Sequence, residues 1–173
     1  VPRLSERRID PRRHLGAHAR KFLGRARRLR SSTKRVVPLD VGKELLGHAS
    51  LDHDAAKAHP LVVVCHGTRP FDSPLRQIRD WVKLAEEKGF LVVAPFLEGT
   101  TASLFRPVRE QIRLQRDDEK HILNVVRHVS GGHNVSQDGI FLTGWAAGNY
   151  AVLHTGQRHP ELFRALAVFQ RKF

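Results

Sequence analysis

Residues 139–148 read Gly-Ile-Phe-Leu-Thr-Gly-Trp-Ala-Ala-Gly, an apolar run followed by two glycines four positions apart. The apolar run predicts a β-strand that is buried on both faces. Gly144 and Gly148 predict a tight turn from that strand into a helix, because such a turn leaves little room for a Cβ on neighbouring backbone. The stretch therefore predicts a strand–turn–helix unit with Ala146 at the turn.

Similar patterns extend on both sides of this unit. Apolar, β-branched runs predict strands, and apolar residues at helical spacing predict helices. We expect strands at 36–41, 44–51, 61–65, 90–94, 140–143 and 163–169, and helices at 74–88, from Pro107 to the pair Gly131-Gly132, and at 149–158. Alternating strands and helices indicate right-handed crossovers. The predicted fold class is α/β, with a mainly parallel sheet and helices on both faces.

Charge divides the 173-residue chain into two parts. Residues 1–35 hold 13 Lys and Arg against Glu6 and Asp10, a net charge of +11, whereas the remainder holds 17 Lys and Arg against 15 acidic residues. The asymmetry is typical of a basic tail on a globular domain. We therefore expect a basic arm over 1–35, disordered or an amphipathic helix, and one α/β domain over 36–173.

The basic arm, residues 1–35, has several open interpretations. It could bind nucleic-acid phosphates, hold an anionic membrane surface by inserting Phe22, Leu23 and Leu29, act as a transit-like leader, or be a solubilising tail or misassigned upstream sequence. No apolar core of secretory length follows its arginine pairs, which disfavours a secretory signal. No run approaches the ~18 apolar residues of a membrane span, so we expect a soluble chain of unknown localisation.

The turn around Ala146 has the layout of a nucleophile elbow, in which a strand ending in G-x-S-x-G turns sharply into a helix. The central residue should be serine, and alanine has no hydroxyl to attack a carbonyl. Three interpretations stay open: a natural loss of catalysis, an engineered serine-to-alanine change, or an ordinary strand–turn–helix. Trp145 either flanks a pocket or packs against a neighbouring helix.

Residues 60–169 resemble the α/β-hydrolase fold family, especially its esterase, polyester-depolymerase or prolyl-oligopeptidase-like branch. Leu61–Gly67 resembles the family's strand running into a His-Gly oxyanion turn. Gly144–Gly148 resembles its elbow, and His159–Ala165 resembles the end of its elbow helix. The resemblance implies hydrolysis of carboxylic esters or peptide bonds in active members.

The family's mechanism needs a serine, a histidine, an acid and backbone N–H groups that bind an oxyanion. Carried over, Ala146 takes the nucleophile position, and the oxyanion donors are the N–H of Ala147 and one from Gly67-Thr68. The resemblance further implies that the pocket and elbow include His66, Gly144, Trp145 and Gly148. Such a pocket would take an ester- or acyl-like small molecule.

The acid and base of that mechanism are expected to be missing. Glu161 is the sole carboxylate after the elbow, and His154 and His159 lie on or at the end of the elbow helix. The family places both groups after later strands. We therefore expect the N-terminal portion of a truncated α/β-hydrolase-like domain, catalytically inactive as written.

A strand ending near Phe169 would be an exposed apolar edge, which soluble proteins avoid. We expect either a fragment of a longer protein or a partner or second copy that covers this edge. The alternative function is a non-enzymatic binding protein whose basic arm attaches to nucleic acid or an anionic membrane.

The remaining reactive side chains predict no cofactor and no metal. No Cys or His spacing is typical of zinc. Cys65 is expected to be a buried structural thiol, because it and His66 point to opposite faces of a strand end. The polar stretch Arg113–Lys120 is expected to be a solvated helix face with local ion pairs.

Overall fold

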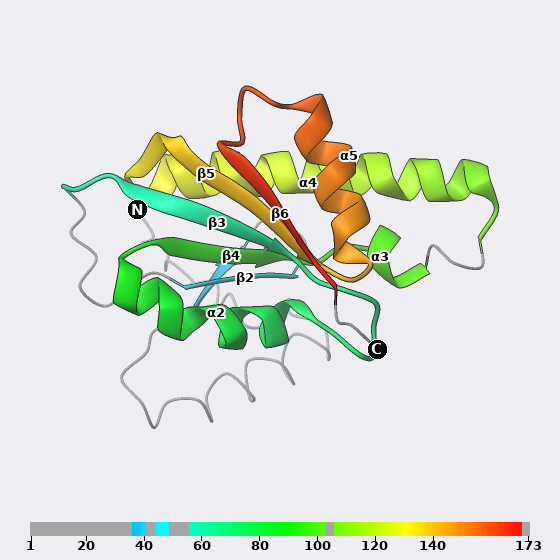
Figure 1. Ribbon diagram of the computed structural model, residues 1–173, viewed down its shortest axis with the longest axis horizontal. Helices are drawn as coiled ribbons and strands as arrows, with labels where there is room; N and C mark the ends of the chain where they lie inside the picture. Colours follow the sequence, from blue (N-terminus) through cyan, green and yellow to red (C-terminus); the bar gives the residue numbers. More distant parts are fainter. Residues whose placement is uncertain (1–35, 41–43, 49–55, 103–105, 171–173) are drawn as a thin grey trace, which may run out of the picture. The chain divides into compact units, whose positions relative to one another are not determined.

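The computed structural model describes residues 36–40, 44–48, 56–102 and 106–170 (Figure 1). The basic arm expected at 1–35, and the interpretations attached to it, lie outside the described residues. The domain expected at 36–173 contains every described element.

The described elements form one six-stranded sheet with helices on both faces. The strands are β1 (Val36–Asp40), β2 (Glu44–His48), β3 (His59–Cys65), β4 (Leu91–Pro95), β5 (Val135–Trp145) and β6 (Ala165–Phe169). The helices are α2 (Pro74–Lys88), α3 (Gly99–Ala102), α4 (Val108–Gly132) and α5 (Gly148–Arg158). The strand order is β1-β2-β4-β3-β5-β6. Strands β4, β3, β5 and β6 are parallel, whereas β1 and β2 are antiparallel. The predicted α/β class is confirmed.

The two faces of the sheet are covered differently. Helix α2 lies on one face and α4 and α5 on the other (Figure 1). The main core lies between the sheet and α4 and α5, where Leu61, Val63 and Leu142 meet Ile122 and Val152. Coverage of both faces explains why β3 and β4 are almost wholly apolar rather than alternating.

Cys65 belongs to that core and is fully buried, as expected for a structural thiol. Burial raises the pKa of the Cys65 thiol, because the thiolate would lose its hydration, and the charge of Asp118 adds to the effect. The thiol is therefore protonated at neutral pH and chemically inert.

Helix α2 begins and ends where the sequence predicts. The Arg76 N–H donates to the Ser73 hydroxyl at 3.3 Å, and Gly89 closes the helix in the left-handed region, at φ 72°. The long helix α4 differs from expectation at both ends: Pro107 is its N-cap, and Gly131 and Gly132 continue it to His133.

The apolar spacing in the sequence predicts an inner face of α4 made of Val108, Ile112, Ile122, Val125 and Val129, and this prediction is wrong in the first turns. Val108 and Ile112 are 69% and 44% exposed, and burial begins at Leu114. The first turns run past the end of the sheet (Figure 1), so the sheet does not cover them. Hydrophobic spacing identified the helix but not the length of sheet available to cover it.

Strand β6 is an edge of the described sheet and pairs with β5. All five of its residues are exposed, including Leu166, Val168 and Phe169. The exposed apolar edge predicted from the sequence is therefore present; its coverage by a partner or second copy stays a prediction. No helix in the described ranges is long and apolar enough to cross a membrane.

Candidate functional site

Strand β5 enters α5 through a sharp turn at Ala146. The residue has φ 49°, in the left-handed region that alanine rarely adopts, so the turn is strained. A Cβ on Gly144 would lie 2.7 Å from the carbonyl carbon of Gly148, and a Cβ on Gly148 would collide with the carbonyl oxygen of Cys65. Both glycines are therefore required by close backbone contact, and the predicted strand–turn–helix unit is confirmed.

The turn is tied to the end of β6. The Ala146 N–H donates to the carbonyl oxygen of Phe169 at 2.9 Å. The Asn149 side-chain amide donates to the same carbonyl at 3.0 Å and accepts from the Phe169 N–H at 3.3 Å. The first turn of α5 thus holds the carboxyl end of β6 against the elbow.

Asp72 organises the loop that follows β3. Its buried carboxylate accepts from the N–H of Gly67 at 2.6 Å, from the N–H of Ser73 at 2.7 Å and from the Gln77 side-chain amide at 2.8 Å. Sequence reasoning missed Asp72, although its place directly before the Ser73 helix cap was a usable signal. Because Gly67 already donates to Asp72, Gly67 is not the oxyanion donor of the predicted pair Gly67-Thr68.

Two backbone donors remain available beside the turn. Among the described residues, no hydrogen bond uses the N–H of Thr68 or of Ala147. Thr68 is held in place on either side of that N–H: its hydroxyl donates to the Thr100 carbonyl at 3.0 Å, and its carbonyl accepts from the Asp72 N–H at 3.1 Å. The N–H of Ala147 lies at the amino end of α5, where the helix dipole favours negative charge.

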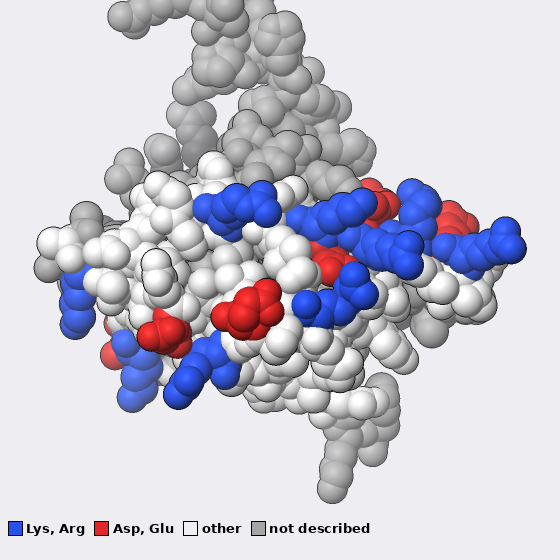
Figure 2. Space-filling view, turned by 90° about the horizontal axis from the view of Figure 1, so that it is seen from above, with Lys and Arg blue, Asp and Glu red and all other residues white. Residues whose placement is uncertain are grey.

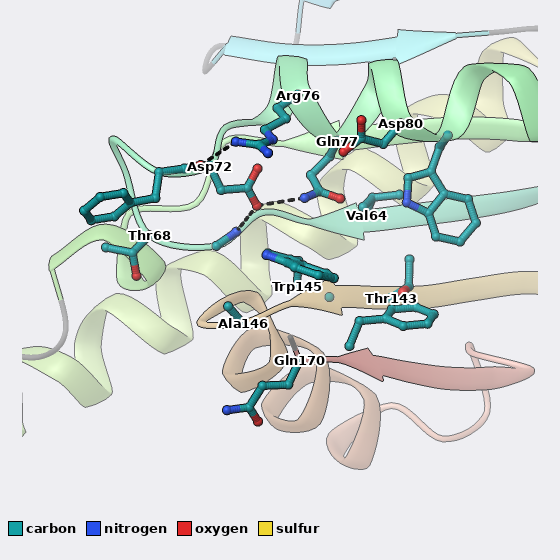
Figure 3. A pocket seen from close by; sticks show the side chains of 15 residues that line it. Val64, Thr68, Asp72, Arg76, Gln77, Asp80, Thr143, Trp145, Ala146 and Gln170 are labelled. Atoms are coloured by element: carbon teal, nitrogen blue, oxygen red, sulfur yellow. Dashed lines mark hydrogen bonds between the residues drawn. The ribbon is translucent and has the colours of Figure 1, made fainter. Parts of the chain in front are cut away.

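A pocket of about 800 Å³ opens beside Ala146 (Figure 3). Four aromatic side chains line it: Phe71, Trp81, Trp145 and Phe169. Polar side chains enter it from α2 and from β5, among them Gln77, Asp80 and Thr143 (Figure 3). Of the two interpretations of Trp145, the structure therefore favours the residue that flanks a pocket.

The structure brings together most of the predicted site residues. Gly67, Thr68, Gly144, Trp145 and Ala146 all line the pocket. Ala147 and Gly148 are not lining residues; they form the start of the helix behind the turn. His66, expected in the pocket, is fully buried and does not line it.

His66 has a structural role. The Leu97 N–H donates to its Nε2 at 3.0 Å, so the proton resides on Nδ1, which donates to the Gly67 carbonyl at 2.7 Å. Burial lowers the pKa of His66, because the imidazolium would be poorly hydrated. A neutral imidazole with both nitrogens occupied links the ends of β3 and β4 and cannot serve as a base at the elbow.

The other two histidines singled out by the sequence lie elsewhere, on a carboxylate of α4. Nε2 of His154 lies 3.0 Å from Oε2 of Glu119, and Nε2 of His159 lies 2.8 Å from its Oε1. Nε of Arg158 donates to Oε1 at 3.0 Å. Burial alone would raise the pKa of Glu119, but these three hydrogen bonds outweigh burial and lower it. This Glu119 cluster joins α4 to α5, and none of its members lines the pocket.

The expected solvated face over Arg113–Lys120 is only half right. Arg113 and Lys120 form exposed ion pairs with Asp117, and Figure 2 shows basic beside acidic side chains on the surface. Asp118 and Glu119 are instead buried, which corrects the prediction. Each lies three or four residues before Ile122, on the inward helix face, and that spacing was the overlooked signal.

The buried carboxylate of Asp118 holds the backbone at the start of α3 by hydrogen bonds. It accepts from the N–H of Glu98 at 2.9 Å and of Gly99 at 2.8 Å. It therefore caps the start of the short helix α3 and has no place at the elbow. Within the described ranges, no group of three His, Cys, Asp or Glu could hold a metal ion.

Solved structures similar to this chain include esterases and other hydrolases. The chain is 19% identical to a thermostable esterase, covering 77% of this chain and 40% of that one, with a TM-score of 0.51. It is 16% identical to a ferulic acid esterase of Anaeromyces mucronatus, with coverages of 81% and 59% and a TM-score of 0.57. It is 15% identical to the fluorophosphonate-binding serine hydrolase F of Staphylococcus aureus, with coverages of 80% and 59% and a TM-score of 0.58.

No protein-family model matches the sequence, and no curated protein sequence matches it significantly. The chain spans between two fifths and three fifths of the three solved structures named above. At this identity the likeness concerns the fold. The parallel strands and covering helices of this chain form an α/β-hydrolase-like fold, and the chain shares this arrangement with part of each of these esterases and serine hydrolases.

Proposed function

We propose that the pocket beside Ala146 binds an ester- or acyl-like small molecule and that the chain, as written, does not hydrolyse it. The observation that carries the proposal is the pair of backbone N–H groups, of Thr68 and Ala147, that no other described residue uses. Such a pair is what a carbonyl oxygen, or the oxyanion formed from it, requires. Aromatic walls suit the apolar part of an acyl group.

The absence of catalysis follows from two positions. Ala146 occupies the place of the elbow nucleophile, and its methyl group cannot form a covalent intermediate. None of the described residues that line the pocket is a histidine, so the histidine base of the family's mechanism is not found among them. In this proposal Ala146 replaces an ancestral serine; the alternatives are an engineered change and an ordinary strand–turn–helix.

A thiol at the elbow tests the oxyanion donors without needing a base, because thiolate is intrinsically nucleophilic. Ala146→Cys places that thiol at the amino end of α5, which lowers a thiol pKa. We expect p-nitrophenyl acetate to release about one equivalent of p-nitrophenolate: a C–S bond forms, the ester C–O bond breaks, and the thioester accumulates. Gln157→Cys, an exposed position at the far end of α5, is the matched control, and buried Cys65 contributes no background.

Alkylation by iodoacetamide, which forms no oxyanion, corrects for differences in thiol reactivity. After that correction we expect the elbow variant to be acylated at least about tenfold faster than the control, since one oxyanion donor is worth roughly 10²–10³ in a mature enzyme. Equal corrected rates would show that the turn stabilises no oxyanion, and the proposal would fail.

Ala146→Ser tests the missing acid and base. We expect no steady-state hydrolysis of p-nitrophenyl acetate by this variant, because a serine without a general base is a weak nucleophile. Turnover by the variant would mean that a histidine from outside the described residues reaches the elbow. In that case the chain would lack only the nucleophile, because Ala146 has no hydroxyl.

The charge of residues 1–35 favours a second candidate function, attachment to a polyanion. Thirteen cationic residues against two acidic ones would neutralise phosphates on nucleic acid or an anionic membrane. We expect the full chain to bind RNA or phosphatidylglycerol vesicles with an affinity that falls steeply with salt, and a chain lacking residues 1–35 to lose this binding. Unchanged binding after the deletion would eliminate this candidate.

A further inference from the structure

The first turns of α4, which run past the end of the sheet, expose two aliphatic side chains (Figure 1). Val108 is 69% exposed and Ile112 is 44% exposed. Because they lie four residues apart, the two side chains are neighbours on the helix surface. A single exposed aliphatic side chain is ordinary, so the meaning of this pair depends on the groups beside it.

Two guanidinium groups flank Ile112 on the helix surface. Arg109 lies three residues before it and Arg116 four residues after it, and both arginines are exposed. Among the described residues, neither arginine forms an ion pair or a hydrogen bond. Their charges are therefore available to another molecule. We call Val108, Arg109, Ile112 and Arg116 the α4 patch.

The exposed carboxylates of α4 do not neutralise this patch. Because successive residues of a helix are about 100° apart, Glu110 and Asp117 lie about 160° and about 140° around the axis from Ile112. Each of them already forms ion pairs with cationic neighbours, which are Arg106, Arg113 and Lys120. The α4 patch therefore combines exposed aliphatic surface with two positive charges that no described carboxylate balances.

We propose that the α4 patch docks on an anionic membrane surface. Guanidinium groups bind lipid phosphates through paired hydrogen bonds, and aliphatic side chains enter the boundary between headgroups and acyl chains. In Figure 2 Lys and Arg side chains predominate where α4 runs past the sheet, and this charge attracts anions. Nucleic acid also carries phosphates, but it offers no apolar phase for Val108 and Ile112, and the patch has no aromatic side chain for bases to stack on. The inference is independent of the pocket.

Helix α2 provides an internal comparison. Its Leu84 is 42% exposed, nearly the same as Ile112. The charged neighbours of Leu84 at three and four residues' distance are two carboxylates, Asp80 and Glu87, and one lysine, Lys88. An anionic surface would be repelled there and attracted at Ile112. The two positions therefore differ in the sign of the surrounding charge and hardly in exposure.

A polarity-sensitive dye on the patch reports contact with a membrane directly. The full chain carries Ile112→Cys labelled with a nitrobenzoxadiazole dye, and Leu84→Cys labelled in the same way is the matched control. Buried Cys65 does not take up the dye. When vesicles of equal parts phosphatidylglycerol and phosphatidylcholine are added, we expect the dye at position 112 to brighten and to emit at shorter wavelength, because it enters an apolar phase. The dye at position 84 should not change.

Removal of the two free charges measures their share in vesicle binding. Each basic residue near an anionic surface contributes about fivefold in affinity, so Arg109→Gln with Arg116→Gln should weaken binding of the full chain to these vesicles about ten- to thirtyfold. Arg79→Gln with Lys88→Gln is the control of equal charge, since both side chains are exposed cations of α2 without an ion pair among the described residues. The control should weaken binding less than about threefold, because its charges lie away from the contact.

Four outcomes would overturn the inference. If the chain binds vesicles while the dye at position 112 does not change, another part of the chain makes the contact. If the two double variants lose affinity equally, binding follows net charge and not the α4 patch. If Arg109→Gln with Arg116→Gln weakens binding of a short single-stranded RNA but not of vesicles, the patch binds nucleic acid and the membrane is the wrong partner. If the full chain does not bind the vesicles at all, no membrane contact exists.

Discussion

The turn at Ala146 and the Glu119 cluster hold different kinds of chemical group, in two different places. The turn has the backbone geometry: a left-handed residue, two available N–H groups and a pocket. The cluster has the titratable groups, with Glu119 within 3.0 Å of His154 and His159. The cluster does not line the pocket, and the turn has no histidine beside it among the described lining residues.

This separation shows why residue types alone do not identify a catalytic site. A carboxylate beside two histidines resembles the acid–base part of a triad, yet here it links α4 to α5 and includes Arg158. Neither His154 nor Glu119 lines the pocket beside Ala146. Function on this fold depends on which groups the strand ends bring together.

Among changes that compare the turn with the Glu119 cluster, Gly148→Ala is expected to alter the free energy of unfolding most. The added Cβ would collide with the Cys65 carbonyl, and both partners are backbone, so neither can move aside cheaply. We expect a loss of about 3 kcal/mol in the free energy of unfolding, measured by urea denaturation. Gly131→Ala, with open space around its Cβ, is the control and should gain up to about 1 kcal/mol. Similar small changes at both positions would mean that the turn is not tightly packed.

Glu119→Gln should have the next largest effect. The change replaces the carboxylate that accepts hydrogen bonds from Arg158 and from two histidines by a neutral amide. Each hydrogen bond to a charged group contributes about 1.5–3 kcal/mol to stability. We expect the variant to lose about 2 kcal/mol in the free energy of unfolding while ester binding is unchanged. Asp117→Asn breaks only exposed ion pairs and should lose less than about 0.5 kcal/mol. A loss of ester binding by Glu119→Gln would contradict the separation of the two regions.

The same carboxylate predicts a pH dependence. Because the folded state lowers the pKa of Glu119, its contribution to stability is complete above the unfolded pKa and is lost as pH falls through the folded pKa. Denaturation between pH 7 and pH 3 should therefore show stability declining below the ordinary glutamate pKa. Glu119→Gln should flatten that part of the profile. Parallel profiles for the two proteins would show that other carboxylates dominate acid unfolding.

The smallest effect is expected from Asn149→Ala, at the contact between the elbow and β6. The variant loses two hydrogen bonds to the backbone of Phe169, both exposed. We expect a loss of about 1 kcal/mol in the free energy of unfolding and faster amide exchange at Phe169. Asn124→Ala, an exposed helix position with a local contact to Arg127, should leave that amide unchanged. Unaltered exchange in both variants would show that Asn149 does not hold the strand.

The sequence by itself determined the order of the elements, the α/β class and the turn at Ala146. These depend on local signals: apolar β-branched runs, apolar residues at helical spacing, and the paired Gly144 and Gly148. Such features act over a few residues, so they can be read in order along the chain.

Tertiary structure alone decided which side chains meet. The Asp72 carboxylate accepts a hydrogen bond from the N–H of Gly67, and Glu119 forms hydrogen bonds with His154 and His159. His66 is buried, and both of its ring nitrogens form hydrogen bonds. Each contact depends on side chains that meet only once the chain has folded, and several join segments more than thirty residues apart. Burial and hydrogen bonding then set the protonation state of each group, and no local pattern in the sequence records that environment.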